Sequence, residues 1–526
     1  MKAHQRLPRM IAIALVVILV AVMVAACSSK NESGSASSDS GAKASSSPSA
    51  SASGAEASGD AQQDVKALDP VELVWYYPQW SAQQDLQQVQ DAMNKIVKDK
   101  INATVTLKSI DFGDYEQKMN IAIAANEAFD IVWTANWAFN YQANALKGAF
   151  LPLNELLENY GKDVYDSMPS YIWNATNVGG KIYGVPNYQT VTNRPGFLVQ
   201  KQYAEKYKLD PSQIKKFSDL EPFLEAVKAG EPNLVPLAMD RTGSFRAALS
   251  LYNLEEINYT ASFYTNTDSI KVINMFETPE FKEYLTLVRS WYKKGLINQD
   301  APTLKSFNDL TSTGQAVARF HNVLKPGGEA EYKGQFGGNE IIYVPVGNST
   351  VGTNTIITTM NAVSKTSKNP ERAMMFLNLI NTDKELYNLM SYGIEGEHYT
   401  KISDDTIRLI EGSGYATGSN WMYGNTFNGY YMEGQAPGTW EATIEDNNNA
   451  IPSKLMGFTF NNEPVKAEIA NLATIMDEYE GIISTGASDF EKKLPELNDR
   501  LKKAGSEAVE AEAQRQIDEW LKTSGK

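Results

Sequence analysis

The pattern of apolar and polar positions changes sharply along the first part of the chain. Met10 to Ala26 is an unbroken apolar run of 17 residues, and Ser28 to about Asp60 has no apolar periodicity. From Val71 onward, two kinds of segment follow each other in alternation. Some are short and either apolar or alternately apolar and polar, as in strands, and the others have helical periodicity. The pattern predicts strands over 71–77, 103–110 and 129–133, with helices over 81–100 and 113–125 between them.

Strands that alternate with helices predict a parallel α/β sheet. Ligands of such sheets bind in a crevice beyond the carboxyl ends of the strands. The residues that follow the three predicted strands are polar or aromatic, which is the composition of a pocket. We therefore expect these residues to line a binding site: Tyr77, Trp80, Asp111, Trp133, Asn136 and Trp137.

Further along the chain the pattern predicts helices over 153–160, 164–173, 201–208 and 219–229, and strands over 197–200, 316–320 and 341–344. One helix is marked clearly, because Thr278 can cap it, Pro279 suits its first turn and Gly295 can end it. Trp291 lies on the apolar stripe of this helix, so we expect it in the core.

A pair of helices is predicted after residue 368. Asn369-Pro370 begins the first, which reaches Ile380. Thr382 and Glu385 have the spacing of a capping box for the second, which is predicted to stop at Gly393. The pair is expected to return to the first half of the fold, which places a second crossing between two lobes near residues 346–358.

The N-terminus has the features of an export signal. Lys2, Arg6 and Arg9 precede the apolar run, and small residues precede Cys27, the single cysteine of the chain. A membrane-spanning anchor is the alternative, although its 17 apolar residues fall short of the roughly 20 needed to cross a bilayer. The Ser/Ala/Gly-rich residues 28–66 predict a disordered tether, because they cannot offset the entropy of ordering by burial.

The net charge and the length of the chain limit its possible partners and its number of domains. Cleavage before Cys27 removes three basic residues and no acid, so the formal charge changes from −15 to −18. A surface this acidic repels polyanions, which argues against nucleic acid as a partner. The remaining length suits two or three domains. Cys27 has no partner for a disulfide.

Few residues suggest catalysis. The three histidines form no zinc-protease motif, and no phosphate-binding loop is present. His398 is expected to be a structural, hydrogen-bonded residue. Glu395 and Glu397 can be solvated charges of a turn, part of a glycosidase pair, or anchors for sugar hydroxyls. Arg194 is expected to form an ion pair between lobes, with hydroxyl donation as the alternative.

The aromatic residues give the main indication of the kind of ligand. They cluster near Trp75 to Trp80, Trp133 to Tyr141 and Trp421 to Tyr431, interleaved with amides and acids. Sugars present C–H faces to rings while their hydroxyls need polar partners, so this mixture favours a carbohydrate ligand. Core packing is the alternative explanation for each ring. From these later clusters we add Glu397, Trp421, Asn425 and Tyr430 to the candidate ligand-binding residues.

Several short motifs resemble one protein family. The segment ending at Cys27 resembles a bacterial lipobox, in which the cysteine is lipidated. G-K-I-Y-G-V-P at 180–186 and F-D-I-V-W-T-A-N-W at 129–137 resemble family 1 extracellular solute-binding proteins, the receptors of carbohydrate ABC importers. G-I-E-G-E-H-Y at 393–399, W-M-Y-G-N-T-F at 421–427 and Q-R-Q-I-D-E-W at 514–520 resemble the LplA-like subgroup, which has an extra C-terminal domain. Typical members often have Lys where this chain has Glu397.

The resemblance implies an α/β fold of the two-lobed, periplasmic-binding-protein-like type II, with a hinge and a helical C-terminal extension. It places lobe 1 at 67–190 and 350–410, lobe 2 at 191–349, and a C-terminal region that completes the fold at 411–526. The implied function is a lipid-anchored receptor on the extracytoplasmic face of the cell membrane, which captures an oligosaccharide or related glycoside and delivers it to an ABC permease.

We expect no enzyme activity, no cofactor and no metal, and a monomer as the oligomeric state. Hinge closure on the ligand is the expected mechanism. A surface lipoprotein glycoside hydrolase with a carboxylate pair is the alternative function.

Overall fold

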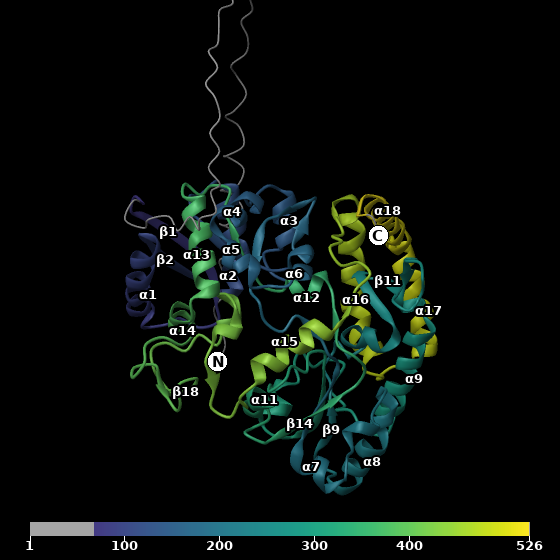
Figure 1. Cartoon of the computed structure of the whole chain (residues 1–526). Coiled ribbons are helices and arrows are strands. Elements are labelled where there is room, and N and C mark those ends of the chain that lie inside the picture. The colour runs from purple at the N-terminus through teal and green to yellow at the C-terminus, as the bar shows by residue number, and fades with distance from the viewer. Residues whose placement is uncertain (1–67, 525–526) are drawn as a thin grey trace, which may run out of the picture. The chain divides into compact units, whose positions relative to one another are not determined.

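The computed structural model describes residues 68–524 (Figure 1). The predicted signal, the tether and Cys27 lie outside these residues. Among the described residues, no helix combines the length and the apolar character needed to cross a membrane.

The first sheet has five strands in the order β2-β1-β3-β16-β6. Their bounds are β1 (Val71–Gln79), β2 (Ala103–Asp111), β3 (Ile131–Thr134), β16 (Met360–Val363) and β6 (Gly184–Pro186). β1 runs parallel to β2 and β3, whereas β16 is antiparallel to β3 and β6. The parallel arrangement predicted for the first three strands is therefore confirmed. β1 runs past Pro78, where it pairs only with β2, an edge position at which proline is tolerated.

Helices cover this sheet because their apolar stripes face it. In α1 (Leu86–Ile101) the buried residues are spaced as in an amphipathic helix, at Val89, Met93, Val97 and Ile101. The other helices of this part are α2 (Phe112–Ala124), α3 (Tyr141–Leu146), α4 (Asn154–Tyr160), α5 (Lys162–Asp166), α6 (Ser170–Ala175), α12 (Thr353–Ile356), α13 (Pro370–Thr382), α14 (Lys384–Tyr392) and α15 (Thr439–Asn449).

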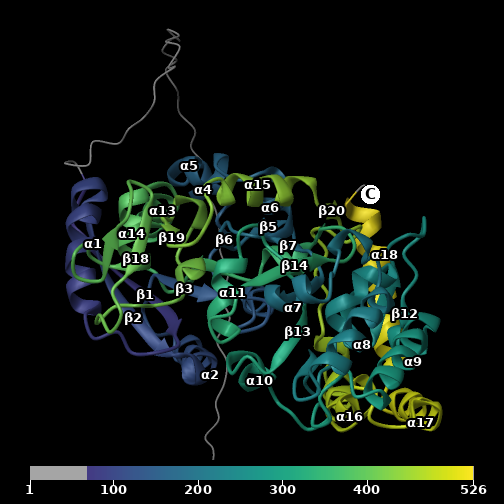
Figure 2. The same ribbon diagram turned by 90° about the horizontal axis from the view of Figure 1, so that it is seen from below.

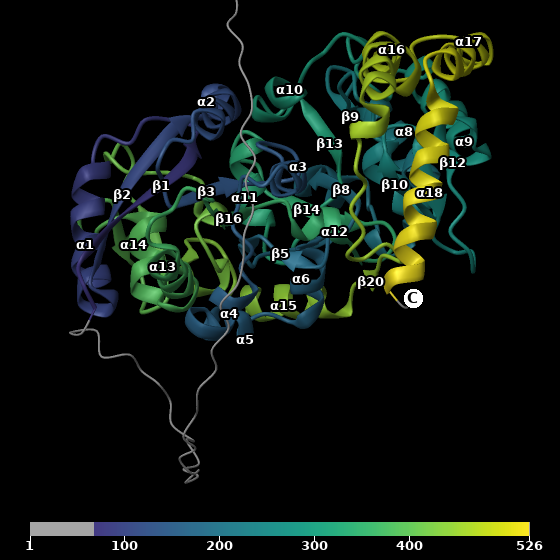
Figure 3. The ribbon, with the colours of Figure 1, turned by 90° about the horizontal axis from the view of Figure 1, so that it is seen from above.

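The second sheet has four strands in the order β14-β8-β13-β9. Their bounds are β14 (Ile341–Pro345), β8 (Gly196–Gln200), β13 (Ala316–His321) and β9 (Val235–Ala238). The helices of this part are α7 (Lys201–Lys206), α8 (Glu221–Gly230), α9 (Pro279–Lys293), α10 (Asn308–Ser312), α11 (Glu329–Gln335), α16 (Lys466–Ser484), α17 (Phe490–Lys503) and α18 (Ser506–Ser524). The last three gather beside α9 (Figures 2 and 3).

Most buried apolar side chains of the described residues belong to two large hydrophobic cores. The first takes its buried side chains from 73–191 and 351–456, and the second from 197–346 and 465–513. Three segments therefore join the cores, and a small sheet of β7 (Thr192–Asn193), β15 (Thr350–Val351) and β20 (Ile451–Pro452) lies among them. The sequence pattern indicated only two crossings. The third takes the chain back to the second core, which is why α16 and α17 pack there.

The helix marked in the sequence by Thr278 forms as predicted. The Thr278 side chain accepts a hydrogen bond from the Phe281 amide at 3.3 Å, and Pro279 occupies the first turn. Gly295 adopts a φ of +69°, a conformation that suits glycine beyond a helix end. Trp291 is 0% exposed, so its assignment to the core is confirmed.

Two local predictions are wrong. The N-cap of α14 is Asp383, whose side chain accepts from the Leu386 amide at 2.9 Å, while Thr382 bonds back to Asn378 and ends α13. Aspartate caps a helix as well as threonine does, so the box spacing was misleading. The helix expected over 164–173 is two helices, α5 and α6, because Pro169 cannot continue a helical hydrogen-bond ladder.

Candidate functional site

Four rings form a row that we call the aromatic ledge: Trp80, Phe112, Trp137 and Trp421. The ring centroids of Trp80 and Phe112 lie 4.1 Å apart, those of Phe112 and Trp137 5.5 Å, and those of Trp137 and Trp421 6.3 Å. Trp80 and Trp137 are each 49% exposed, although both are large apolar side chains. Exposed rings in a row are unusual on a soluble protein and indicate a binding surface.

The sheet explains why the ledge forms. Trp80 follows β1, Phe112 follows β2, and Trp137 lies in the turn after β3. These strands are parallel, so their carboxyl ends meet at the same edge of the sheet. The structure thus brings Trp80, Trp137 and Trp421 together. Phe112 was missed, although its position directly after a strand was the signal that selected Asp111.

The turn after β3 is fixed by hydrogen bonds to residues 354–358. The indole nitrogen of Trp137 donates to the Thr358 carbonyl at 2.8 Å, and the Asn136 side-chain amide donates to the Asn354 carbonyl at 2.9 Å. Asn136 therefore positions the ledge, and its neighbour Trp137 keeps half of its ring exposed in one orientation. A ring held in this way loses little entropy when a ligand stacks on it.

Trp133 and Tyr77 are buried, and here the sequence expectation needs correction. Trp133 is 0% exposed, its indole nitrogen donates to the Thr359 hydroxyl at 2.9 Å, and its ring packs against those of Trp137 and Trp421. Tyr77 is 3% exposed, and burial raises the pKa of its phenol well above the ordinary value. β3 extends one residue beyond Trp133, so that side chain belongs to the sheet and not to the crevice.

A pocket of about 380 Å³ adjoins the ledge at Trp421. Its lining comes from the end of α14, from residues 415–421, from α15 and from the loop after β13 that carries Lys325. The lining alternates rings with hydroxyl and amide groups, among them Trp440, Gln189, Asn420 and Gln435. Lys325 lies in 197–346, the part of the chain that supplies the second core, and the rest of the lining lies in 73–191 and 351–456, which supply the first, so both parts of the chain contribute to the pocket. No carboxylate occurs among the described residues that line it.

The other predicted residues have structural contacts outside this pocket. Asp111 caps α2 by accepting from the Gly113 amide at 2.9 Å, and Asn425 caps a short helix by accepting from the Phe427 amide at 3.0 Å. Tyr430 packs against Tyr392 and Tyr399. Glu397 is exposed and accepts a hydrogen bond from Gln88 on α1. The structure therefore does not bring Asn425, Tyr430 and Glu397 into the row of ledge rings.

The remaining charged candidates are tied to partners. His398 is 1% exposed, accepts at Nδ1 from the Ile394 amide at 2.8 Å and lies 3.3 Å from Asp85 through Nε2, as expected of a structural histidine. Arg194 lies 3.8 Å from Asp446 on α15, which is the expected ion pair. Within residues 68–524, no three or more acidic or histidine side chains are grouped so that they could hold a metal ion.

Comparison with known families gives two matches. A model described as bacterial extracellular solute-binding protein matches residues 91–394. A model described as a domain of unknown function, DUF3502, matches residues 454–522. The second match spans the third crossing and helices α16 to α18.

Individual relatives give the same picture. A carbohydrate ABC transporter substrate-binding protein of Streptococcus pneumoniae serotype 4 is 32% identical over 444 residues, 82% of this chain and 87% of the relative. The polygalacturonan/rhamnogalacturonan-binding protein YtcQ of Bacillus subtilis strain 168 is 24% identical and covers 56% of this chain and 61% of its own length.

Solved structures are similar as well. The N-glycan transport solute-binding protein NgtS of Streptococcus pneumoniae is 30% identical, with 87% of this chain and 100% of that chain covered and a TM-score of 0.76. The complex of NgtS with Man5GlcNAc, which covers 86% of this chain and 99% of that one, has a TM-score of 0.65 at 30% identity.

Proposed function

Since this chain belongs to the family of bacterial extracellular solute-binding proteins, we propose that it is the membrane-tethered receptor of an ABC importer. In this proposal it captures an oligosaccharide or related glycoside between two lobes and delivers it to the permease. One observation carries the choice of ligand. The exposed rings of the aromatic ledge meet, at Trp421, a pocket lined by hydroxyl and amide groups.

The chemistry of this surface suits a sugar. Flat C–H faces of pyranose rings pack on Trp80 and Trp137, which are half exposed. Hydroxyl groups need donors and acceptors in fixed positions, and Gln189, Asn420 and Gln435 supply amides for both roles. The buried ring of Trp133 packs against Trp137 and Trp421 and so supports the ledge. The ledge and the pocket together suit a ligand of several sugar units.

Binding is coupled to movement of the lobes in this proposal. We assign residues 67–190 and 350–410 to lobe 1 and 191–349 to lobe 2, with the C-terminal helices packed on the second core. Lys325 of lobe 2 reaches the pocket, so a ligand held there contacts both lobes and favours the closed state over the open one. The permease then recognises the closed form.

The proposed location follows from the N-terminal sequence. Cys27 is the single cysteine and follows an apolar run and two alanines. We propose that the chain is exported, that Cys27 is lipidated, and that residues 28–66 hold the monomeric receptor outside the cell membrane. A lipid anchor keeps the receptor near the permease without a spanning helix.

A glycoside hydrolase is the competing function, and the pocket argues against it. Hydrolysis requires two carboxyl groups on either side of the glycosidic bond. The described lining of the pocket has none, and Glu395 lies 3.3 Å from Lys401 in a surface ion pair. We therefore propose binding without turnover.

A glycan panel tests the proposal. Thermal shift identifies glycans that stabilise the protein, since a ligand bound only by the folded state raises its stability. Calorimetry on the best glycan is expected to show one site, with weaker binding by Trp137→Ala. Man5GlcNAc is one member of the panel, because NgtS was solved with it. Stabilisation by no glycan, together with binding of a peptide or polyol, would contradict a sugar ligand.

A further inference from the structure

The third crossing between the cores includes a segment that we call the strap, residues 453–461, which forms turns at 454–457 and has no regular structure from there to Asn461. On one side it contacts the first core: Met456 is buried there, and the Gly457 amide donates to the Thr353 hydroxyl at 2.8 Å. The side-chain amide of Gln142 on α3 donates to the Thr459 hydroxyl at 3.0 Å. The Thr353 hydroxyl also donates to the Leu455 carbonyl at 3.3 Å, so one apolar side chain and several hydrogen bonds attach the strap to the first core.

On its other side the strap packs on α18 and on strand β11 (Ala261–Tyr264). Leu455 and Phe458 form a small separate hydrophobic cluster with Phe263 of β11 and Ile517 of α18. The ring of Phe458 lies 5.8 Å from that of Trp520, edge to face. Through this apolar contact α18 holds the strap on the side of the second core.

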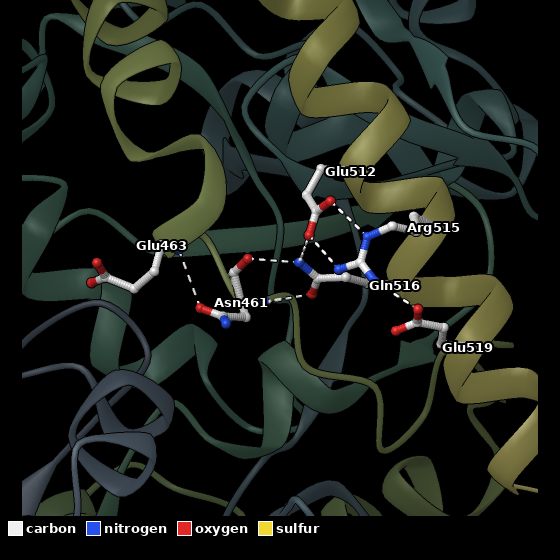
Figure 4. Close-up of polar contacts among 6 residues, drawn as sticks. All are labelled: Asn461, Glu463, Glu512, Arg515, Gln516 and Glu519. Carbon is white, nitrogen blue, oxygen red and sulfur yellow. Dashed lines mark hydrogen bonds and ion pairs between the residues drawn. The ribbon is translucent and has the colours of Figure 1, made fainter.

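A glutamine side chain completes this attachment. The Oε1 atom of Gln516 accepts from the Asn461 amide, and its Nε2 atom donates to the Asn461 carbonyl, both at 2.8 Å (Figure 4). Both backbone groups of Asn461 are thereby engaged by one side chain, as they would be by a neighbouring strand. A paired contact of this kind fixes orientation as well as distance.

Two charged neighbours orient the glutamine. The Nε2 atom of Gln516 also donates to Glu512 at 2.8 Å, and Glu512 is held by Arg515. Arg515, followed by Gln516, lowers the pKa of Glu512 to about 2, so it stays an acceptor near neutral pH. Arg515 in turn also pairs with Glu519 at 2.7 Å (Figure 4). Glu512 and Arg515 therefore hold the side-chain amide of Gln516 in the orientation that its contact with the strap requires.

We propose that the domain of unknown function acts as a hinge restraint: α18 holds the strap on the second lobe, so the third connection limits how far the lobes rotate. The inference rests on the two-lobed architecture and not on the identity of the ligand. Lobe rotation requires backbone torsions to change at the connections. Because Asn461 is fixed, the change is confined to the strap residues before it, where Gly457 has a φ of +88°.

The same helix supplies a matched control. The side chain of Gln514 accepts from the Val272 amide at 2.8 Å and donates to the Ile270 carbonyl at 3.1 Å. It makes the same type of paired contact as Gln516, but with a segment beside the small cluster and not with the strap. Replacing either glutamine by methionine removes one paired contact and keeps a side chain of similar size.

The experiment measures lobe movement without ligand. Spin labels are placed at Lys95→Cys on α1 and Ala229→Cys on α8, both exposed, in a full-length Cys27→Ser background. Electron–electron resonance distances are then compared among the parent chain, Gln516→Met and Gln514→Met. Gln516→Met is expected to broaden the distance distribution, whereas Gln514→Met leaves it unchanged. Hydrogen exchange of the Asn461 amide should accelerate by about 10-fold in Gln516→Met alone.

Two results would overturn the proposal. One is a distance distribution of Gln516→Met that superimposes on the parent although the Asn461 amide exchanges faster. The other is equal broadening by Gln514→Met. A second variant, Gln516→Glu, keeps the acceptor for the Asn461 amide and loses the donor, so intermediate broadening is expected and the test survives misfolding of Gln516→Met. Failure to bind sugar leaves these distances unaffected, which separates this inference from the proposed function.

Discussion

The ledge can be tested by comparing three tryptophans that differ in burial. Trp137 is 49% exposed, whereas Trp133 behind it and Trp291 in the second core are both 0% exposed. Each is to be replaced by alanine. The three variants separate a ring that contacts ligand from rings that only stabilise the fold.

Burial sets the expected loss of stability. A tryptophan buries roughly 200 Å² when fully enclosed, so about half of that area is lost in Trp137→Ala, and at about 25 cal/mol per Å² this is at most about 2.5 kcal/mol. All three replacements also remove an indole hydrogen bond, so Trp133→Ala and Trp291→Ala differ from Trp137→Ala in that they remove the whole buried area. Core truncations of this kind cost about 3–5 kcal/mol. Urea unfolding followed by circular dichroism measures the differences.

Binding is expected to follow the opposite order. Loss of a stacking ring costs about 1–3 kcal/mol at a binding hot spot, which weakens affinity roughly 5- to 150-fold. Trp137→Ala should therefore bind the best glycan of the panel at least about 5-fold more weakly in calorimetry. Trp291→Ala should bind normally in its folded fraction, because it lies in the other core. Normal affinity of Trp137→Ala, with loss of affinity in Trp291→Ala, would refute the ledge as the site.

Three further predictions concern the anchor, turnover and pH. Cys27→Ala should abolish metabolic lipid labelling and release the protein from membranes, and normal labelling would contradict lipidation. A glycan incubated with the protein should be recovered intact by chromatography, and steady product formation would favour the hydrolase. Burial of Glu255, which lies on β10 (Leu254–Asn258), raises its pKa to about 7, although Ser453 donates to it. Because the folded state keeps this proton above the ordinary pKa, its contribution to stability is full below about 4.5 and is lost as pH rises through about 7. Glu255→Gln should remove that part of the pH dependence of urea unfolding.

The family and most of the helices and strands could be predicted from the sequence. The expected solute-binding family, the two-lobed α/β fold and the extra C-terminal domain are confirmed. Periodicity located the first three strands and the helix after Thr278, because apolar spacing and capping residues act within a few positions of each other. Local signals failed where two residues compete for one role, as Thr382 and Asp383 do at the start of α14.

The candidate site was only partly predictable. Strand ends pointed to Trp80 and Trp137, because the geometry of a parallel sheet brings those ends together. The same rule also selected Trp133 and Tyr77, since it cannot tell which side chain of a strand end faces the core. β3 continues to Thr134 and all four of its side chains are buried, so both of its faces are covered and Trp133 packs in the core.

The sequence by itself determined most of the elements, the family and the aromatic, polar composition of the candidate site, since these depend on local spacing and on composition. Only the tertiary structure decided which aromatic rings are exposed, that Lys325 reaches the pocket, and that a third crossing returns the chain to the second core. It also shows what the motif Q-R-Q-I-D-E-W contacts: the side chains of Gln514 and Gln516 form hydrogen bonds with backbone segments more than 50 residues away in sequence. Contacts between such distant residues leave no periodic trace along the chain, because they depend on how whole elements pack together.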